Sequence, residues 1–248
     1  MSASRSDMTG NDFSGSSEEI CPCDQSVARA SATRLSVESL LLLGQIALNR
    51  NDFSQAFTMF ETAARSGDAK ALNMLGRAYE RGWGTVRNPN QAALCFYESA
   101  TAGDGWAMFN LADLYLSGQG IQKDTVLAYN YYIGAARKGI GKALNMLGLL
   151  HEDGSIGSPD LQTASIFFQA ASDAGDHWGA LNLGRIYLFT GDQTQACASF
   201  HHALQVGKAE ALEALTKLLS NIDDHSSTKT ISDVILARIR LYKPGRSS

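Results

Sequence analysis

The sequence predicts an all-α protein built from about five helix–turn–helix repeats. Two observations carry this prediction: a regularly spaced glycine, and two amphipathic patterns that recur at fixed distances from it. The spacings between successive glycines are 36, 36, 36 and 32 residues, and the glycines are Gly67, Gly103, Gly139, Gly175 and Gly207. Repeat proteins with a period of this kind mostly serve as binding surfaces.

The first pattern precedes each glycine and predicts one helix per repeat, here called helix B. An alanine stands eleven residues before each glycine, an aromatic residue seven before, and alanine or serine four before. Offsets of eleven, seven and four residues fall on one face of a helix, so a bulky ring alternates there with small residues. The rings are Phe60, Phe96, Tyr132, Phe168 and Phe200.

The second pattern follows each glycine and predicts the other helix of each repeat, helix A. It is centred on a small residue, preceded directly by leucine, with a further apolar residue four positions before the centre in every copy. We expect the small central residue to allow a close approach of helix B. The central residues are Gly44, Gly76, Ala112, Gly148 and Gly184.

The connections from helix A to helix B carry the residues that end one helix and begin the next. Glycine suits the end of helix A, and Asp, Asn or Pro suits the start of helix B, as in Gly82-Trp-Gly84 followed by Asn88-Pro89. The connection is four residues shorter in the first and fifth copies, which accounts for the 32-residue spacing.

The segment ALNMLGRAYERGWGTVRNPNQAALCFYESATAG resembles a Sel1-like repeat, a relative of the tetratricopeptide repeat, and three consecutive copies share its pattern. The two short copies, residues 36–67 and 176–207, look closer to tetratricopeptide repeats. Ala112 in place of the central glycine and His151 in place of the usual tyrosine depart from the pattern. The resemblance covers Ser36 to Ser220 and implies a right-handed α-solenoid whose A helices line a concave face, in a family mostly used for scaffolding.

The two ends of the chain lack the repeat. Residues 1–34 are rich in Ser, Gly and Asp and are expected to be disordered, so that the repeat domain spans 35–220. Residues 221–248 are expected to form a linker, a capping helix over 231–242 and a short basic tail. That helix, together with 209–219, would cover the last repeat. Because it carries Arg238 and Arg240, a role at a membrane surface is its alternative.

One side of helix A is left free by the packing pattern. Counting from the central residue as zero, positions −6, −3, −2, +1, +4 and +5 lie opposite the buried stripe. Three of these positions alternate over two repeats: position −6 reads Lys70, Trp106, Lys142 and Trp178. The hexamer ALNMLG also recurs at 71–76 and 143–148, which indicates a duplicated pair of repeats.

These free positions give the predicted partner-binding face, because exposed apolar patches and tryptophan often mark interaction sites. Its apolar residues would form two pockets, and Lys70, Arg77, Lys142 and Arg185 would orient an acidic or C-terminal group of the partner between them. The alternative is that the rings pack against neighbouring helices or against the N-terminal segment. The predicted residues are Lys70, Asn73, Arg77, Trp106, Phe109, Asn110, Leu116, Lys142, Asn145, Trp178, Leu181, Arg185, Leu188 and Phe189.

Composition excludes two classes of function. Lys and Arg together number 21 against 25 acidic residues, so the chain has no basic footprint of a nucleic-acid-binding protein. No run of 18 apolar residues exists that would predict a membrane span. The first residues show no apolar stretch of a secretory signal, so we expect a cytoplasmic protein, with non-classical secretion as the open alternative.

The four cysteines share no fixed place in the repeat, which fits a reducing compartment rather than a repeated disulfide. Cys21-Pro-Cys23 could bind a metal or cycle between redox states, but no second such motif accompanies it, and we expect two exposed thiols. Cys95 and Cys197 lie beside core positions of helix B and are interpreted as small packing residues.

The sequence predicts no catalytic residue, cofactor or metal. His201 and His202 are adjacent and point about 100° apart on a helix, so they cannot share one metal ion. His151 is interpreted as a packing residue. The Gly82–Gly84 motif lies between helices rather than after a strand, and no nucleotide-binding loop or hydrolase motif is present.

The predicted function is therefore that of an adaptor or scaffold that binds a protein or peptide segment in the concave groove. A secreted bacterial effector that binds host proteins is one alternative. A second comes from the resemblance alone: some cysteine-rich relatives are associated with β-lactam hydrolysis, although this chain lacks their regular cysteine pairs. The alternating pattern would also allow a homodimer through the same groove.

Overall fold

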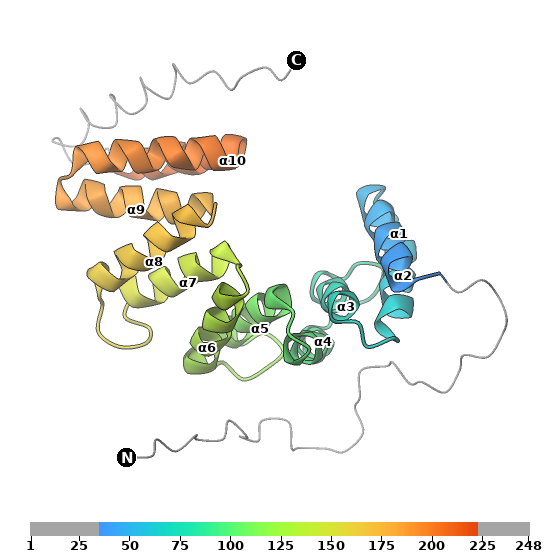
Figure 1. Ribbon diagram of the computed structural model, residues 1–248. Coiled ribbons are helices and arrows are strands. Elements are labelled where there is room, and N and C mark those ends of the chain that lie inside the picture. Colours follow the sequence, from blue (N-terminus) through green and yellow to red (C-terminus); the bar gives the residue numbers. More distant parts are fainter. Residues whose placement is uncertain (1–34, 223–248) are drawn as a thin grey trace, which may run out of the picture.

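The computed structural model describes residues 35–222, which form ten α-helices and no strand within that range. The helices follow one another as five antiparallel pairs along a curved path, with the first and last pairs at its two ends (Figure 1). Their bounds are α1 Val37–Asn49, α2 Phe53–Ala64, α3 Ala69–Arg81, α4 Pro89–Thr101, α5 Gly105–Ser117, α6 Thr125–Arg137, α7 Gly141–Glu152, α8 Leu161–Asp173, α9 His177–Thr190 and α10 Gln193–Ile222.

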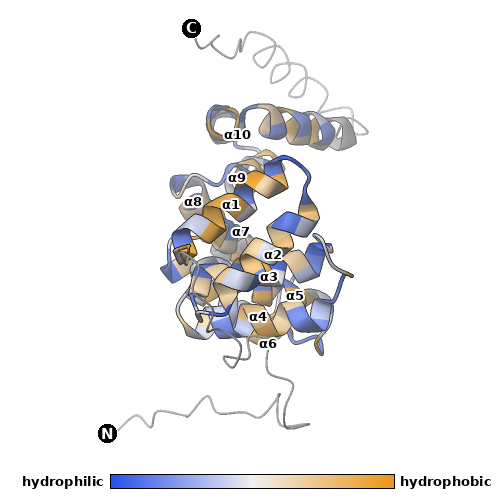
Figure 2. Cartoon of the chain, turned by 90° about the vertical axis from the view of Figure 1, so that its right-hand side faces the viewer, coloured by the Kyte–Doolittle hydropathy of each residue, from blue (hydrophilic) through white to orange (hydrophobic). Residues whose placement is uncertain are grey.

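The architecture is the predicted all-α repeat solenoid. The odd-numbered helices are the A helices and the even-numbered ones are the B helices. Each helix packs mainly against the helices directly before and after it in the chain, and α7 also contacts α9. Hydrophobic and hydrophilic residues occur together on the same helices, as amphipathic helices require (Figure 2). The core is accordingly apolar and lies between the A and B helices, as one large cluster of buried residues from Leu40 to Leu150 and two smaller clusters toward the C-terminal end.

Short polar side chains begin nearly all of the helices. The Asp104 side chain accepts a hydrogen bond from the backbone N–H of Ala107 at 2.7 Å, and Asp68 does the same for Ala71 at 2.9 Å. Such a cap satisfies one of the backbone donors that the first turn leaves unpaired. Helix α7 is the exception, because Ile140 occupies its cap position and offers no side-chain acceptor.

The aromatic ring of each B helix packs directly over the central residue of its A helix. At four of the five centres that residue is glycine, and a Cβ atom there would lie 2.4 to 2.6 Å from a ring carbon. Examples are Gly44 against Phe60 and Gly148 against Phe168. In the third repeat, where the centre is Ala112, the ring is that of Tyr132, and both residues are fully buried. The predicted role of the small central residue is confirmed.

The loops after α3 and α5 touch the start of the preceding B helix. A Cβ atom on Gly84 would lie 2.2 Å from the backbone oxygen of Phe53, and one on Gly120 would lie 2.4 Å from the backbone carbon of Pro89. Both glycines also have positive φ, 68° and 75°. Glycine is therefore required twice over at these positions, for its conformation and for the close approach.

The last of the five spaced glycines differs from the others. The first four have φ between 77° and 93°, whereas the reversal after the fifth B helix occurs at Lys208, with φ 46° and ψ −116°. This residue divides α10 into the fifth B helix and a second helical part. Leu215 and Leu219 of that second part lie in one buried cluster with Leu181 of α9 and Phe200. The segment 209–219 thus covers the last repeat, as expected.

Some predictions concern residues outside the described range of 35–222. They are the predicted disorder of residues 1–34, the predicted exposure of the Cys21 and Cys23 thiols, and the predicted linker, capping helix over 231–242 and basic tail. Of the other two cysteines, Cys95 is fully buried in the main core and Cys197 packs beside the C-terminal cluster, as interpreted from the sequence.

A pair of glycine substitutions tests the loop contact. Gly139→Ala adds a Cβ at positive φ with nothing within 4 Å, so it is expected to cost about 1–2 kcal/mol in the free energy of unfolding. Gly120→Ala carries the same conformational cost and also drives the Cβ into the backbone of Pro89, so it is expected to cost at least about 3 kcal/mol. Urea denaturation of both variants measures the difference, and equal losses would contradict the contact.

Candidate functional site

A pocket of about 600 Å³ opens between the A helices α1, α3, α5 and α7. Apart from the cap residue Asp104, every residue that lines it occupies one of the positions that the repeat pattern leaves free. Seven of the fourteen predicted partner-binding residues meet in this pocket. They are Lys70, Asn73, Arg77, Trp106, Phe109, Asn110 and Lys142.

Trp106 is the largest exposed side chain of this pocket. It is 46% exposed and packs edge-on against Phe109, with their ring centroids 6.0 Å apart. Phe109 in turn contacts the buried ring of Tyr132 at 5.7 Å, which ties the exposed indole to the core. The Lys142 ammonium group lies over the indole at 5.9 Å, within cation–π range. The tryptophan is therefore held in place while one side remains open.

Arg77 is half-buried in the wall of the pocket. Its guanidinium lies 5.2 Å from the centroid of the Trp83 ring and donates to the Met74 sulfur at 3.8 Å. No carboxylate lies within ion-pair distance of it in the range 35–222. Burial, followed by the nearby positive charge of Arg81, lowers the pKa of Arg77. A partly desolvated cation of this kind favours an anionic partner.

The asparagines of the predicted site serve to join neighbouring A helices. The side-chain amide of Asn110 donates to the Asn73 side-chain oxygen at 2.9 Å, and the amide of Asn182 donates to Asn145 at 2.8 Å. Asn145 is 9% exposed and lines neither pocket, so our expectation that it is accessible in the groove was wrong. Asn73 lines the larger pocket, but it is only 7% exposed and its side-chain oxygen is already bound to Asn110. Position −3 faces the next A helix, and its polar group must find a partner there.

Arg185 was expected to orient an acidic group of the partner, but its guanidinium is already paired with a carboxylate of the same chain. Its two terminal nitrogens donate to the two carboxylate oxygens of Glu152 at 2.7 and 2.6 Å. Glu152 stands at the end of α7 and Arg185 in the middle of α9. This bidentate pair holds two consecutive A helices together and neutralises the guanidinium.

In the C-terminal half of the predicted face, the packing of the last repeat covers some of the predicted residues and leaves others exposed. Leu181 is 2% exposed and belongs to the cluster that α10 covers, so its predicted place in the groove was wrong. Leu188 packs against the same cluster. Trp178 remains 45% exposed and Phe189 82% exposed. Neither of these two rings lines the pocket around Trp106.

Sequence reasoning missed Asp113, which lies at position +1 of α5. Its carboxylate accepts a hydrogen bond of 2.5 Å from the Tyr132 hydroxyl, and it lines the pocket beside Trp106. Burial raises the pKa of Asp113 to about 6, and the hydrogen bond from Tyr132 opposes that rise. The hint in the sequence was Tyr132 itself, because the hydroxyl of a tyrosine at a buried ring position needs a partner.

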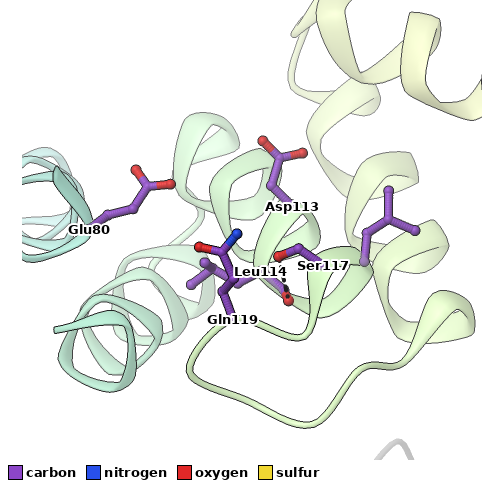
Figure 3. A pocket seen from close by; sticks show the side chains of 6 residues that line it. Glu80, Asp113, Leu114, Ser117 and Gln119 are labelled. Atoms are coloured by element: carbon purple, nitrogen blue, oxygen red, sulfur yellow. Dashed lines mark hydrogen bonds between the residues drawn. The ribbon is translucent and has the colours of Figure 1, made fainter. Parts of the chain in front are cut away.

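A second pocket, of about 300 Å³, adjoins the first on the side of the loop after α5 (Figure 3). Glu80 and Asp113 line both pockets. Figure 3 shows Glu80 reaching from α3 toward α5, where Asp113 and Ser117 stand beside the same space, with Gln119 next to them. Leu116, another of the predicted partner-binding residues, lines this smaller pocket rather than the larger one.

The histidine of α7 has a structural role. His151 stacks on Phe167, with ring centroids 5.2 Å apart, and its Nε2 lies 3.3 Å from the Tyr129 hydroxyl. Within residues 35–222 no three His, Cys, Asp or Glu side chains are placed to hold a metal ion. Over the same range, no helix has the length and apolar character needed to cross a bilayer.

Family models match the chain along most of the described range. A model of the Sel1 repeat matches residues 30–68, 69–104, 107–140 and 141–176, and a model of the tetratricopeptide repeat matches 180–206. The first short copy, which we expected to lie closer to tetratricopeptide repeats, therefore matches the Sel1 model, and only the last copy matches the tetratricopeptide model.

The chain shares local similarity with curated proteins, among them the following two. The chitin synthase regulator SKT5 of Saccharomyces cerevisiae is 28% identical over 128 residues, which are 50% of this chain and 18% of SKT5. HRD3A of Arabidopsis thaliana, an ERAD-associated E3 ubiquitin-protein ligase component, is 33% identical over 78 residues, 32% of this chain and 12% of HRD3A. The matches thus span less than a fifth of either relative.

Solved structures share the fold over a longer range. A Sel1 repeat protein from Oxalobacter formigenes superposes with a TM-score of 0.69 at 20% identity, over 84% of this chain and 89% of that one. The protein c5321, a protective antigen present in uropathogenic Escherichia coli strains, superposes with a TM-score of 0.61 at 25% identity, over 75% of this chain and 42% of that one.

The raised pKa of Asp113 predicts a pH-dependent stability. Because the pKa lies near 6 in the folded chain and at 3.8 ordinarily, the folded state holds the extra proton between these pH values. Asp113 therefore contributes favourably to the free energy of unfolding below about pH 4, and this contribution is lost as the pH rises through 6. Asp113→Asn keeps an acceptor for Tyr132 and removes the charge, so the variant is expected to be about 1–3 kcal/mol more stable than the wild type at pH 8.

The two proteins are expected to be equally stable near pH 4, which urea denaturation at both pH values measures. Glu213→Gln is the matched control, because it removes an exposed carboxylate on α10. It should change the stability little at either pH. An Asp113→Asn variant that is less stable than the wild type at pH 8 would show that the ionised carboxylate is not penalised by its surroundings.

Proposed function

The chain belongs to the Sel1 repeat family, and on that premise we propose that it is an adaptor that binds a segment of another protein in the groove of its A helices. The named relatives support this class of role, since one is described as a regulator and the other as a component of a ligase. A rigid row of packed repeats suits this role, because the groove side chains are positioned before the partner arrives.

The observation that carries the proposal is the convergence of free A-helix positions on one pocket around Trp106. Half of this indole is buried against Phe109, so its conformation is fixed, and the other half is open to a partner. Large aromatic side chains held in this way are frequent anchors of protein interfaces, because they bury much area at little loss of side-chain entropy.

One basic group near the indole favours an acidic group on the bound segment. The pocket is lined by basic and acidic side chains together, but Arg77 is half-buried with no carboxylate at ion-pair distance in the range 35–222. A carboxylate of the partner would give that guanidinium the counterion that Glu152 gives to Arg185. Arg185 itself has a different role in this proposal, because it joins α9 to α7 and so stabilises the wall of the groove.

A second anchor would lie further along the groove, where Trp178 takes the position in α9 that Trp106 has in α5. With Phe189 it leaves two large rings exposed near the C-terminal end of the solenoid. An extended segment could then reach both tryptophans, which gives each of the two repeat pairs one anchor. We propose no catalytic role for the groove.

Removing both anchors tests the adaptor. The variant Trp106→Ala with Trp178→Ala is expected to lose capture of its partners by at least about a hundredfold, because hot-spot tryptophans each contribute about 2 kcal/mol or more. The measurement is affinity capture with quantitative mass spectrometry, alongside the helical circular dichroism signal, which should not change.

The matched control removes two exposed apolar side chains from B helices. Val126 is 64% exposed and Ile166 is 69% exposed, so Val126→Ala with Ile166→Ala deletes apolar surface outside the groove. It should capture the same partners as the wild type. Capture that survives loss of both tryptophans, or that the control variant loses as well, would rule out the groove as the binding surface.

A further inference from the structure

The two pairs of repeats that share the ALNMLG sequence differ at one equivalent contact. In the second pair, Glu152 at position +4 of α7 holds the guanidinium of Arg185 at position +1 of α9. The residues 72 positions earlier are Glu80 on α3 and Asp113 on α5. The same junction of two A helices therefore joins a carboxylate to an arginine in one pair, and has two carboxylates lining one pocket in the other.

The like charges at the first junction act on each other and lack an internal arginine between them. The negative charge of Glu80 adds to the rise in the pKa of Asp113 that burial causes. Within residues 35–222, the only ion-pair partner of the Glu80 carboxylate is the Arg81 side chain, at 3.4 Å, and that arginine is 64% exposed. An exposed ion pair of this kind contributes little to stability. The two carboxylates at the junction would therefore be stabilised by a further cation.

A pocket is open at this junction and offers acceptors. It measures about 300 Å³, at the lower end of the roughly 300–1,000 Å³ typical of ligand pockets. Glu80 and Asp113 line it from two helices, with Ser117 and Gln119 beside them (Figure 3). Leu114 and Leu116 supply its apolar surface, against which the methylene stem of a long basic side chain could pack.

The basic side chains of the neighbourhood already have other contacts. Arg87 donates to the Gln119 side chain at 2.5 Å and to the Glu80 backbone oxygen at 2.9 Å. Lys142 lies over Trp106. Lys142 and Arg81 lower the pKa of Asp113 through space, but neither comes within ion-pair distance of it. No described cation therefore sits between the two carboxylates as Arg185 does beside Glu152.

We propose that an arginine of the bound protein segment enters this pocket and pairs with Glu80 and Asp113, in the place that Arg185 fills at the equivalent junction. The proposal rests on the groove function and specifies the partner: its segment carries an arginine in addition to the acidic group that meets Arg77. The Glu152–Arg185 pair is the independent observation, because it shows that a guanidinium fits at the equivalent junction of the solenoid.

Arginine fits the site better than lysine. The guanidinium donates in a planar fork, so it can bridge two carboxylates from different helices, as its terminal nitrogens bridge both oxygens of Glu152. A lysine ammonium is more strongly hydrated and would lose more on entering a partly buried pocket. The site should therefore distinguish the two cations.

The direct test uses Nα-acetylargininamide as the probe, with the full chain labelled for NMR. Weak, saturable binding is expected, with shifts at Leu114, Leu116 and Gln119. Nα-acetyl-lysinamide should bind at least about tenfold more weakly, and the neutral citrulline analogue should not bind. No shifts at these residues with the arginine probe, or equal binding of the citrulline analogue, would overturn the proposal.

Two variants assign the binding to the carboxylates. Glu80→Gln with Asp113→Asn keeps the shape of the pocket and should weaken binding of the arginine probe at least about tenfold, since it removes both charge-assisted hydrogen bonds to the guanidinium. Asp113→Arg with Tyr132→Phe rebuilds the second junction, where Phe200 takes the place of Tyr132. It should fill the pocket with an internal ion pair and abolish binding. Unchanged binding in the neutral variant would overturn the proposal even if the rebuilt variant did not fold.

A random linear peptide library separates this proposal from the groove function. Wild-type chain is expected to recover peptides rich in arginine, and the neutral variant should recover peptides without that preference. Recovered peptides that require Trp106 but show no arginine would overturn the arginine site and leave the groove function intact. If the library yields no peptide that requires Trp106, the groove function fails, and the NMR titration still decides whether the pocket binds a guanidinium.

Discussion

The close approach of each B helix to its A helix is the constraint on which the solenoid depends. In four of the five repeats a buried ring packs on a glycine of the A helix, 2.4 to 2.6 Å from where a Cβ atom would lie, and in the third repeat the small residue is Ala112. This contact fixes which face of the A helix points inward, and with it the opposite face. The free positions of five helices consequently align, and the pocket around Trp106 is a result of that alignment. A solenoid of this kind builds a binding surface by repeating one local contact.

Within the aligned face, the junctions between consecutive A helices decide which side chains remain available. Position −3 meets position −2 of the next A helix, as the Asn73–Asn110 and Asn145–Asn182 hydrogen bonds show. Position +4 meets position +1 in the Glu152–Arg185 pair. A residue with a suitable neighbour is thus bonded to the next A helix and is not available to a partner. A residue without such a neighbour keeps an unpaired charge or an exposed ring, and can contact a partner.

Unmet charges of this kind are unfavourable for the isolated chain. Burial raises the pKa of Asp113 and lowers that of Arg77, so each group is held where its charged form is disfavoured. Functional sites often concentrate such groups, because a partner that brings the opposite charge recovers the lost interaction. The first junction retains this disfavoured arrangement, whereas the second relieves it internally. The N-terminal half of the groove is on these grounds the part best suited to recognise a charged partner.

The sequence by itself determined the number of repeats, the two helices of each, the ring over the small residue and the face left free, because these follow from a 3.6-residue period over a few neighbouring positions. It also pointed to Lys70, Arg77 and Trp106. Only the tertiary structure decided that Asn73, Asn145 and Arg185 join helices, that Leu181 is covered by α10, and that Asp113 and Glu80 line the same pocket. These outcomes depend on contacts between residues more than 30 positions apart, which the stacking of one repeat on the next creates and no local pattern records.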